Sequence, residues 1–406
     1  MLKSIGWMAV LRGFAKFLAI IKTLILARIL SPFQFGVFGI ASLVLGFLEI
    51  ITETGINVVL IQEGKTNKKQ LDSAWIVSII RGVILFILIF SISPLIAKFF
   101  NNDSAKNILY LTSLVPLIRG FINPAEVVFQ KNLEFKKEFY FKGLLIFVEI
   151  STAVLLGYLT RSEYCLIWGL IASSIVEVVI SQIFISPRPK LNFDFASFKY
   201  ILKKGIWITF AGTFNYIFQH GDDVVVGKIL GVSPLGLYQQ AYRISSLPVS
   251  EMAEVVQKVT FPYYSKYQMD LILLKNTFKK SFLGTSLLVI PFGILLILFP
   301  YQVINILLGP NWLEAVGVLR VLAIFGMIKA LTNSIFPLLL GLGKQNWVTY
   351  ITLVGIIGMA TTIFPLTRLY GITGTAISTI IGTIVTIPLT LIMLYKIFKN
   401  ESPAKI

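Results

Sequence analysis

The sequence ARILSPFQFGVFGIA at residues 27–41 recurs as GKILGVSPLGLYQQA at residues 227–241, without a gap and at an offset of 200. Six positions keep the same or a similar residue: Arg28 and Lys228, Ile29 and Ile229, Leu30 and Leu230, Gly36 and Gly236, Phe38 and Tyr238, and Ala41 and Ala241. Each copy predicts the same junction, at which one helix ends and the next begins. Duplicated helical bundles around a shared axis are a transporter architecture, in which the transported molecule is handled between the halves. The repeat therefore predicts two similar membrane bundles.

The composition excludes a soluble protein. Hydrophobic residues make up 56% of the 406 residues and charged residues only 14%, whereas soluble domains carry roughly a quarter charged residues. The single cysteine, Cys165, excludes an internal disulfide and a cysteine metal cluster. The first apolar segment contains Arg12 and Lys16 and lacks a small-residue cleavage site, so we expect no cleavable signal peptide.

The apolar runs are long enough to cross a bilayer, which takes about 20 residues per helix. The predicted spans are residues 4–29, 33–61, 71–99, 106–130, 140–160, 164–186, 200–229, 234–264, 279–300, 312–341, 346–366 and 371–396. The widest connection, around Ser186 to Lys204, separates six spans from six. We therefore predict an all-α polytopic membrane protein with two pseudo-symmetric six-helix lobes, residues 1–195 and residues 196–406.

The two lobes are predicted to be parallel repeats, because six is an even number and both lobes then begin on the same side of the membrane. A second, weaker sequence repeat supports this arrangement. Residues 118–123 (IRGFIN) in the fourth span align with residues 328–333 (IKALTN) in the tenth span, at an offset of 210.

The basic residues alternate between the connections. Of the 36 Lys and Arg residues, 21 lie in one set of connections and termini, whereas the opposite set holds only Lys98, Lys106, Arg161, Lys228 and Arg368. The positive-inside rule predicts that both termini and the basic connections are cytoplasmic, in a multi-pass protein of the cytoplasmic membrane. The net charge of +17 is then a topology signal that also attracts anionic membrane lipids, and we expect no binding of nucleic acid.

Ten basic residues remain inside the predicted spans. They are Arg12, Lys16, Lys22, Arg28, Arg81, Arg119, Arg243, Lys258, Arg320 and Lys329. A charge at the bilayer centre costs about 2.5–3.5 kcal/mol on insertion scales, so such residues should face protein or water. Arg12 and Lys16 lie on one helix face and repel each other unless an anion is near. Glu49 and Glu53 have the same spacing in the next span, so the four residues either neutralise one another or line a wet cavity that holds an anionic headgroup.

Lys22 and Asp222 occupy equivalent positions of the repeat. We hypothesise that they form an ion pair between the lobes that closes the outward side; the alternative is that Asp222 and Asp223 pair within their own lobe, with Lys228. The single histidine, His220, lies beside these carboxylates and is better interpreted as a hydrogen-bonded helix residue than as a metal ligand. We predict no metal site.

The sequence shows no enzyme chemistry. The stretch LGLGK at residues 340–344 lacks the spacing of a phosphate-binding loop, and neither a nucleophile elbow nor a zinc motif is found. The connections are too short for a catalytic domain. We therefore predict that the protein is not an enzyme and has no cofactor.

Three stretches resemble a known family: LARILSPFQFGVFGIASLVLGFLEIITETGINVVLIQ at residues 26–62, DDVVVGKILGVSPLGLYQQAYRISSLPVSEM at residues 222–252, and LLGPNWLEAVGVLRVLAIFG at residues 307–326. They are similar to the polysaccharide-transporter branch of the multidrug/oligosaccharidyl-lipid/polysaccharide (MOP, MATE-like) superfamily, which includes Wzx-type exporters of O-antigen, exopolysaccharide and teichuronic acid. The resemblance implies two lobes in a V, with helices 1, 2, 7 and 8 lining a central cavity. It implies translocation of an oligosaccharide on undecaprenyl pyrophosphate from the inner to the outer leaflet.

The resemblance also implies residue roles. Cavity cations bind the pyrophosphate, and by position this role falls to Arg12, Lys16, Arg119, Arg243 and Lys329. From the repeat and from their charge, and not from the resemblance, Lys22, Glu49, Glu53 and Asp222 are our candidates for gating or ion coupling, with either Na⁺ or H⁺ as the coupling ion. The implied partners are the lipid-linked oligosaccharide and, further, the polysaccharide polymerase and chain-length machinery.

Three alternatives are weighed against this function. A drug antiporter of the same superfamily would need a cavity dominated by carboxylates, and the basic residues of the spans argue against it. A lipid II flippase is closer, but the family signature favours the polysaccharide branch. A membrane glycosyltransferase or polymerase should show a large extramembrane loop with catalytic residues, and none is evident.

Overall fold

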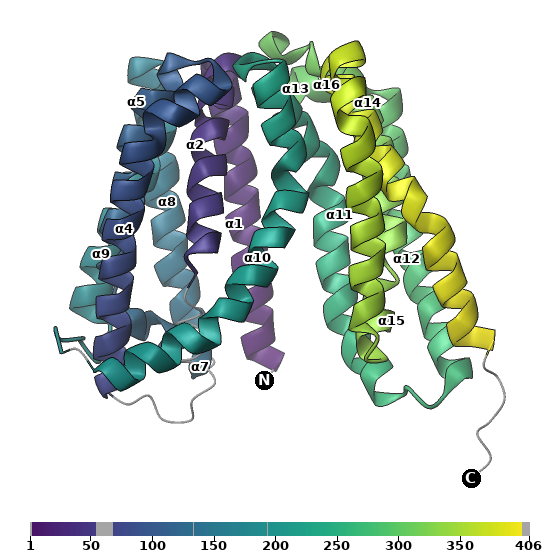
Figure 1. Cartoon of the computed structure of the whole chain (residues 1–406), viewed down its shortest axis with the longest axis horizontal. Helices are drawn as coiled ribbons and strands as arrows, with labels where there is room; N and C mark the ends of the chain where they lie inside the picture. The colour runs from purple at the N-terminus through teal and green to yellow at the C-terminus, as the bar shows by residue number, and fades with distance from the viewer. Residues whose placement is uncertain (1, 54–67, 133, 193, 400–406) are drawn as a thin grey trace. The chain divides into compact units, whose positions relative to one another are not determined.

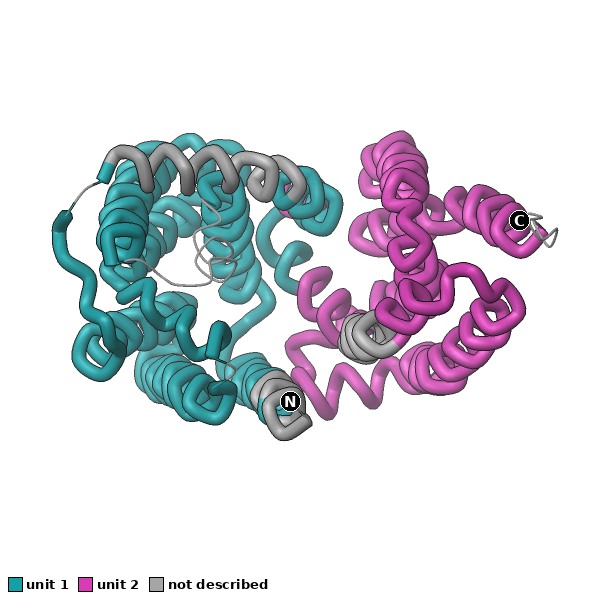
Figure 2. The backbone as a smooth tube through the Cα atoms, turned by 90° about the horizontal axis from the view of Figure 1, so that it is seen from below, with its two compact units in different colours: residues 1–224, 231–236 teal, residues 225–230, 237–406 magenta. Residues whose placement is uncertain are grey.

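The computed structural model describes residues 2–53, 68–132, 134–192 and 194–399, without side-chain detail at residues 2–6, 8, 9, 11, 12, 195–211 and 247–259. The chain forms two compact units. The first comprises residues 1–224 and 231–236, and the second comprises residues 225–230 and 237–406 (Figure 2). We predict the lobe boundary between residues 195 and 196 from the sequence repeat. The compact units are defined by packing contacts instead, so they do not test that boundary, which stays a prediction.

The first unit is entirely helical in its described residues. Its elements are α1 (Leu2–Ile29), α2 (Pro32–Ile51), α4 (Lys68–Phe100), α5 (Asp103–Thr112), α6 (Leu114–Arg119), the 3₁₀ turn η1 (Pro124–Val127), α7 (Val128–Lys131), α8 (Phe135–Thr160), α9 (Tyr164–Phe184) and most of α10 (Phe195–Ile229). Helix α1 packs along α8, and α8 packs on α9. Helix α2 packs on α4, α5 and α9, and α6 lies against α4 and α9 (Figure 1).

The repeated junction has the same boundaries in both copies. Helix α1 ends at Ile29 and α2 begins at Pro32, whereas α10 ends at Ile229 and α11 (Val232–Lys266) begins at Val232. All four boundaries therefore keep the offset of 200 seen in the sequence, and the predicted repeat is confirmed at this point.

Different residues stop the helix in the two copies. Ser31 caps α2: its hydroxyl accepts from the backbone N–H of Gln34, and the Gln34 side chain accepts from the N–H of Ser31. This reciprocal capping box satisfies donors that a helix start otherwise leaves unpaired. Gly231 stands at the equivalent position with a φ of 96°, a conformation that glycine adopts without steric cost.

Two glycines let α2 and α11 cross with their backbones in contact. A Cβ atom added to Gly36 would overlap the carbonyl oxygen of Val232, and one added to Gly236 would overlap the carbonyl oxygen of Pro32. The two contacts are related by the same offset of 200, so the crossing is reciprocal. All four residues belong to the first unit.

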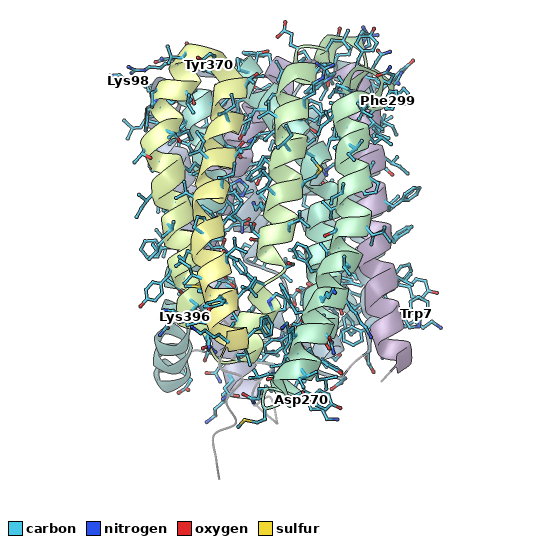
Figure 3. The ribbon with its side chains drawn as sticks, turned by 90° about the vertical axis from the view of Figure 1, so that its right-hand side faces the viewer. Trp7, Lys98, Asp270, Phe299, Tyr370 and Lys396 are labelled. Atoms are coloured by element: carbon cyan, nitrogen blue, oxygen red, sulfur yellow. The ribbon has the colours of Figure 1, made fainter. Side chains whose placement is uncertain are left out.

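The second unit continues the helical pattern. After α11 it contains α12 (Leu271–Leu298), α13 (Pro300–Leu307), the 3₁₀ turn η2 (Pro310–Trp312), α14 (Ala315–Asn333), α15 (Phe336–Gly341) and α16 (Gln345–Lys399). Helix α14 packs on both α12 and α16. Figure 3 places Asp270 and Lys396 at one end of this unit, and Phe299 and Tyr370 at the other. Helix α16 contains two predicted spans, which are divided where Gly371 leaves helical geometry with a φ of 62°.

The predicted spans lie wholly or partly on helices. Within the described residues, seven helices are long and apolar enough to cross a membrane, and an eighth is added if the bent pair Asp103–Arg119 and Pro124–Lys131 is one span. The predicted span over residues 106–130 corresponds to this pair, which bends by 69°. Pro124 cannot donate a backbone hydrogen bond, and the Asn123 side chain accepts from the N–H of Ala125 instead.

The tenth predicted span is broken as well. Helix α14 ends at Asn333, and the short α15 begins at Phe336 with a proline at its second position. The predicted span over residues 312–341 nevertheless agrees with one candidate membrane span, Ala315–Gly341, which contains both α14 and α15. The aligned residues 118–123 and 328–333 mark the end of a helix in both copies.

Candidate functional site

The carboxyl end of α2 lies against an arginine from α4. Arg81 Nη2 donates to the carbonyl oxygen of Glu49 at 2.5 Å, and Arg81 Nε donates to Thr52 Oγ1 at 3.1 Å. The last carbonyls of a helix have no internal donors and carry partial negative charge. Arg81 therefore caps α2 and places a guanidinium group beside its last turn.

A second arginine reaches the same place from α6. Arg119 Nη1 lies 3.2 Å from Glu49 Oε1, and Arg119 Nε donates to Ser174 Oγ of α9 at 3.2 Å. The Arg119 and Glu49 side chains are 37% and 32% exposed. Among the described residues, no acceptor is bonded to Nη2 of Arg119. Within the described residues, this guanidinium group is thus bonded through Nη1 and Nε while Nη2 carries no bond.

These groups line a cavity of about 380 Å³ in the first unit. The lining residues are Glu49, Ile50, Glu53, Ser78, Arg81, Gly82, Leu85, Pro116, Arg119 and Gly120. Two glycines bring α4 and α6 close enough to form it. A Cβ on Gly82 would lie 2.6 Å from the carbonyl oxygen of Pro116, and a Cβ on Gly120 would lie 2.9 Å from that of Ser78.

The cavity suits an anion that can compete with a carboxylate. A guanidinium group presents a planar fork of N–H donors that matches carboxylate and phosphate oxygens. Arg81 and Arg119 are balanced by Glu49 and Glu53, so the empty cavity has no large excess of either charge. A phosphate group would bind by replacing the Glu49 carboxylate on Arg119, which exchanges one anionic partner for another.

The second unit contains a lysine with a different environment. Lys329 of α14 donates to the Tyr242 hydroxyl of α11 at 3.1 Å, and its Nζ lies 5.0 Å from the centre of the Phe325 ring. An ammonium group over an aromatic ring is stabilised by the ring quadrupole. Among the described residues, Lys329 has no carboxylate partner. Within the described side chains, which do not include those of residues 247–259, its positive charge is therefore not neutralised by an ion pair.

The sequence matches the family described as "Polysaccharide biosynthesis protein" over residues 25–317, well over half of the chain. The chain belongs to this family. It is similar to the teichuronic acid biosynthesis protein TuaB of Bacillus subtilis (strain 168), with 26% identity over 75% of this chain and 63% of TuaB. The lipopolysaccharide biosynthesis protein WzxC of Escherichia coli (strain K12) is 23% identical over 84% of this chain and 70% of WzxC. The succinoglycan biosynthesis transport protein ExoT of Rhizobium meliloti (strain 1021) is 25% identical over 84% and 69%.

Solved structures establish the fold of this family member. The lipid II flippase MurJ in an inward closed conformation superposes with a TM-score of 0.76 at 17% identity, covering 96% of this chain and 88% of MurJ. An inward-facing MATE multidrug transporter superposes with a TM-score of 0.73 at 14% identity, covering 96% of both chains. The predicted fold is thereby confirmed: the chain is a multi-pass, all-α membrane protein with a MurJ- and MATE-like fold. Its named relatives include transporters, so the prediction of a polysaccharide biosynthesis transporter rather than an enzyme is confirmed.

The structure corrects the predicted partner of Lys22. Lys22 Nζ lies 2.5 Å from Glu149 Oε1 of α8, and both side chains are mostly buried. Because α1 packs along α8, Lys22 meets a carboxylate within the first unit, and the predicted pair with Asp222 is not formed in this structure. Asp222 itself is buried, and its carboxylate accepts from the backbone N–H of Asp223. Its predicted role in gating stays a prediction.

A stability measurement tests the Lys22–Glu149 pair. Replacing Lys22 with methionine leaves the Glu149 carboxylate buried without its partner, and removing one partner of a buried pair costs about 3–5 kcal/mol. We expect a clear loss of thermal stability, and the double variant K22M/E149M should regain most of it. If the single and double variants are equally stable, the Lys22–Glu149 ion pair does not contribute to the stability of the folded protein.

One contact of Glu49 bears on the two alternatives for the charges of α1 and α2. Glu49 pairs with Arg119 rather than with Lys16, because α2 packs on α4, α5 and α9 while α1 packs on α8. The side chain of Arg12 lies outside the described residues. Lys16 is half-buried on α1, and Glu53 lies at the cavity. The predicted roles of these residues remain untested.

The remaining predicted residues are not among those that line this cavity. His220 Nδ1 lies 3.2 Å from Asp223 Oδ2, so the histidine is hydrogen-bonded within α10 as expected. Arg243 is exposed on α11, beside Tyr242. Sequence reasoning counted Arg81 among the intramembrane cations without giving it a role. Its position ten residues inside the predicted span 71–99 was the available signal.

Proposed function

We propose that this transporter carries oligosaccharide repeat units linked to undecaprenyl pyrophosphate from the inner to the outer leaflet of the cytoplasmic membrane, by alternating access. Both termini lie in the cytoplasm in this proposal. Three relatives are named for three different polysaccharides. If transporters of one family carry different sugars, they must recognise a chemical group that all the precursors share. A lipid-linked pyrophosphate is such a group.

The observation that carries the proposal is the cavity lined by Arg81 and Arg119. A phosphate-bearing headgroup cannot cross hydrocarbon unaided, so its path must offer charged hydrogen-bond donors. In the first unit, Arg119 Nη2 carries no bond among the described residues and can donate to such a group. In the second unit, Lys329 has no described carboxylate partner and so adds a cation of its own. The apolar polyprenyl chain can stay in the lipid.

In the absence of cargo, Glu49 occupies the arginine that would bind the pyrophosphate. With no cargo, the Glu49 carboxylate satisfies Arg119, which avoids an unpaired charge. When a pyrophosphate arrives, its oxygens replace the carboxylate, and the two anions repel each other. This competition keeps binding reversible, which a carrier needs in order to release its cargo on the far side.

The membrane potential favours the proposed direction. An inside-negative potential moves anions outward with about 2.3 kcal/mol per charge per 100 mV. A pyrophosphate diester with two charges therefore gains energy when it moves to the outer leaflet. Coupling to Na⁺ or H⁺ would add to this force.

A reconstitution experiment tests the function. Purified protein in liposomes should move labelled undecaprenyl-pyrophosphate oligosaccharide between leaflets, and liposomes without protein should not. We expect the Arg119→Ala variant to be slower by about tenfold or more, since a hydrogen bond to a charged group contributes about 1.5–3 kcal/mol. The matched control is Arg188→Ala, an exposed arginine that donates to the Ile183 carbonyl oxygen outside the cavity.

Two outcomes of this experiment would test the transport function and the pyrophosphate site separately. No movement above that of empty liposomes would overturn the proposed function. Movement that is equally fast in the Arg119→Ala and Arg188→Ala variants would instead exclude the cavity as the pyrophosphate site and leave the transport activity intact.

A further inference from the structure

The first turns of α12 and the last turns of α16 lie side by side in the second unit. The Phe278 ring of α12 and the Phe398 ring of α16 contact each other, with 6.3 Å between ring centres. Both rings flank one buried apolar cluster, to which Leu274 of α12 and Ile397 of α16 belong. The packing of these side chains therefore holds the start of α12 beside the end of α16.

This end of the unit carries an excess of positive charge. The exposed lysines on these turns are Lys275, Lys279 and Lys280 of α12 and Lys396 and Lys399 of α16. Neither helix contains an aspartate or a glutamate. Asp270 precedes α12 at the same end of the unit as Lys396 (Figure 3), and its carboxylate caps α12 by accepting from the backbone N–H of Leu273 at 2.9 Å.

The lysines of this end are not neutralised within the part of the chain that the structure describes, where no ion pair involves Lys279, Lys396 or Lys399. The first unit differs, because Lys142 pairs there with Glu177 at 2.7 Å. Like charges three or four residues apart on one helix repel each other. An anion from outside the chain would relieve this repulsion.

The same lysines continue the faces that the two helices turn to the lipid. On α12, the exposed Leu283 follows Lys279 by four residues. On α16, the exposed Leu391 and Tyr395 precede Lys399 at the same interval. Residues four apart lie on one face of a helix. In a multi-pass membrane protein these exposed apolar faces meet acyl chains, so the lysines at their ends lie at the depth of the lipid headgroups.

Aromatic rings mark the same depth. Lys399 Nζ lies 5.2 Å from the centre of the Tyr395 ring, which is 61% exposed. Trp347 of α16 packs against the same apolar cluster, and Lys344 Nζ lies 4.3 Å from its ring centre. Tyrosine and tryptophan are enriched where a membrane protein meets the headgroups. An acidic protein would approach from water and would not need exposed apolar side chains on these faces, so a lipid fits the surface better.

We propose that Lys279, Lys280, Lys396 and Lys399 form a binding site for the headgroup of an anionic phospholipid. The ammonium groups donate to the phosphate oxygens, and the acyl chains lie along the exposed faces of α12 and α16. A diffuse positive charge would attract such lipids without preference for one place, whereas this site holds one lipid more tightly than the rest of the surface does. The site requires only the membrane fold, so it does not depend on the proposed cargo.

Native mass spectrometry tests the site. The purified full chain in a non-ionic detergent is titrated with phosphatidylglycerol, which is anionic, or with phosphatidylethanolamine, which is zwitterionic. The apparent Kd of the first retained lipid is measured, and we expect it to be lower for phosphatidylglycerol. A lysine near an anionic headgroup contributes about a fivefold factor, so the double variant Lys279→Gln and Lys399→Gln should weaken this binding by about 25-fold.

The matched control removes the same charge elsewhere in the unit. Arg320 of α14 and Arg368 of α16 are exposed and lie outside the lysine cluster. The double variant Arg320→Gln and Arg368→Gln should leave the Kd for phosphatidylglycerol unchanged. Glutamine favours a helix about as well as lysine does, and both replaced lysines are exposed, so the lysine variant should fold.

Three outcomes overturn the proposal. The first is an equal Kd for the two lipids in the unchanged protein, and the second is an equal Kd for phosphatidylglycerol in the lysine variant and the control. The third is displacement of phosphatidylglycerol by a soluble polyglutamate peptide, which would indicate an acidic protein partner instead.

A second measurement decides if the lysine variant does not fold. A ligand that binds only the folded state stabilises it, so phosphatidylglycerol should raise the melting temperature of the unchanged protein more than phosphatidylethanolamine does. An equal effect of the two lipids overturns the proposal. Because no lipid-linked sugar is present in either measurement, failure here is distinguishable from failure of the proposed function.

Discussion

Replacing Gly36 with alanine should prevent the first unit from folding correctly. The added methyl group would overlap the backbone carbonyl of Val232, and a backbone cannot move aside as a flexible side chain can. Inserting atoms into packed sites usually costs about 1–3 kcal/mol, and a backbone overlap belongs to the exceptional losses above about 4 kcal/mol. We expect most of the protein to aggregate during purification, as measured by size-exclusion chromatography of detergent-solubilised membranes.

A glycine in open surroundings gives the control. An added Cβ at Gly284 of α12 meets no atom within 4 Å, and alanine favours a helix over glycine by about 1 kcal/mol. Gly284→Ala should therefore leave the yield and the thermal stability unchanged or slightly higher. If Gly36→Ala and Gly284→Ala behave alike, the close crossing of α2 and α11 is wrong. Gly236→Ala should repeat the effect of Gly36→Ala, because the contact is reciprocal.

The helix junction is the part of the fold that the sequence predicts best. Glycine at positions 36 and 236 is needed by a close backbone crossing, and Ser31 and Gly231 stop a helix by two different local means. The two helix stops are short-range effects, so they leave a signal in adjacent residues, whereas the crossing leaves its signal in the repeat of glycine at an offset of 200. The same holds for the helical spans, because apolar runs of sufficient length have few alternatives in a membrane.

The helix breaks were less visible. Residues 116–124 (PLIRGFINP) and residues 333–337 (NSIFP) lie inside apolar stretches that are long enough to span a membrane, so the length and mean hydropathy of these stretches do not show where the helices break. The prolines at positions 124 and 337 were the available signal. Prolines within membrane helices are often tolerated as kinks, and this tolerance hides the ones that end a helix.

The ion pairs could not be predicted because they depend on which helices become neighbours. Adjacent spans in the sequence suggested that Glu49 faces Lys16, yet Glu49 pairs with Arg119, 70 residues away. Lys22 likewise meets Glu149 across a separation of 127 residues. Spacing within one helix shows which charges share a face, and only tertiary packing decides what that face meets.

Charge reversal at Lys329 should nearly abolish transport. Under the proposed function, Lys329 offers the pyrophosphate an ammonium group whose described contacts are the Tyr242 hydroxyl and aromatic rings. Lys329→Glu removes this attraction and adds repulsion, and like charges brought together cost several kcal/mol. We expect movement of labelled lipid-linked oligosaccharide in liposomes to fall by about a hundredfold, since each 1.4 kcal/mol is a factor of ten.

Three further variants separate the charge of Lys329 from its packing. Lys329→Arg keeps the positive charge and should retain most of the transport. Lys329→Gln keeps a donor for Tyr242 without the charge, and its rate should lie between those of the arginine and glutamate variants. Arg368→Glu reverses an exposed charge on α16 and should leave transport unchanged. If Lys329→Glu and Arg368→Glu give equal rates while both proteins remain folded, Lys329 does not contact the cargo, and the cations that carry the pyrophosphate are confined to the first unit.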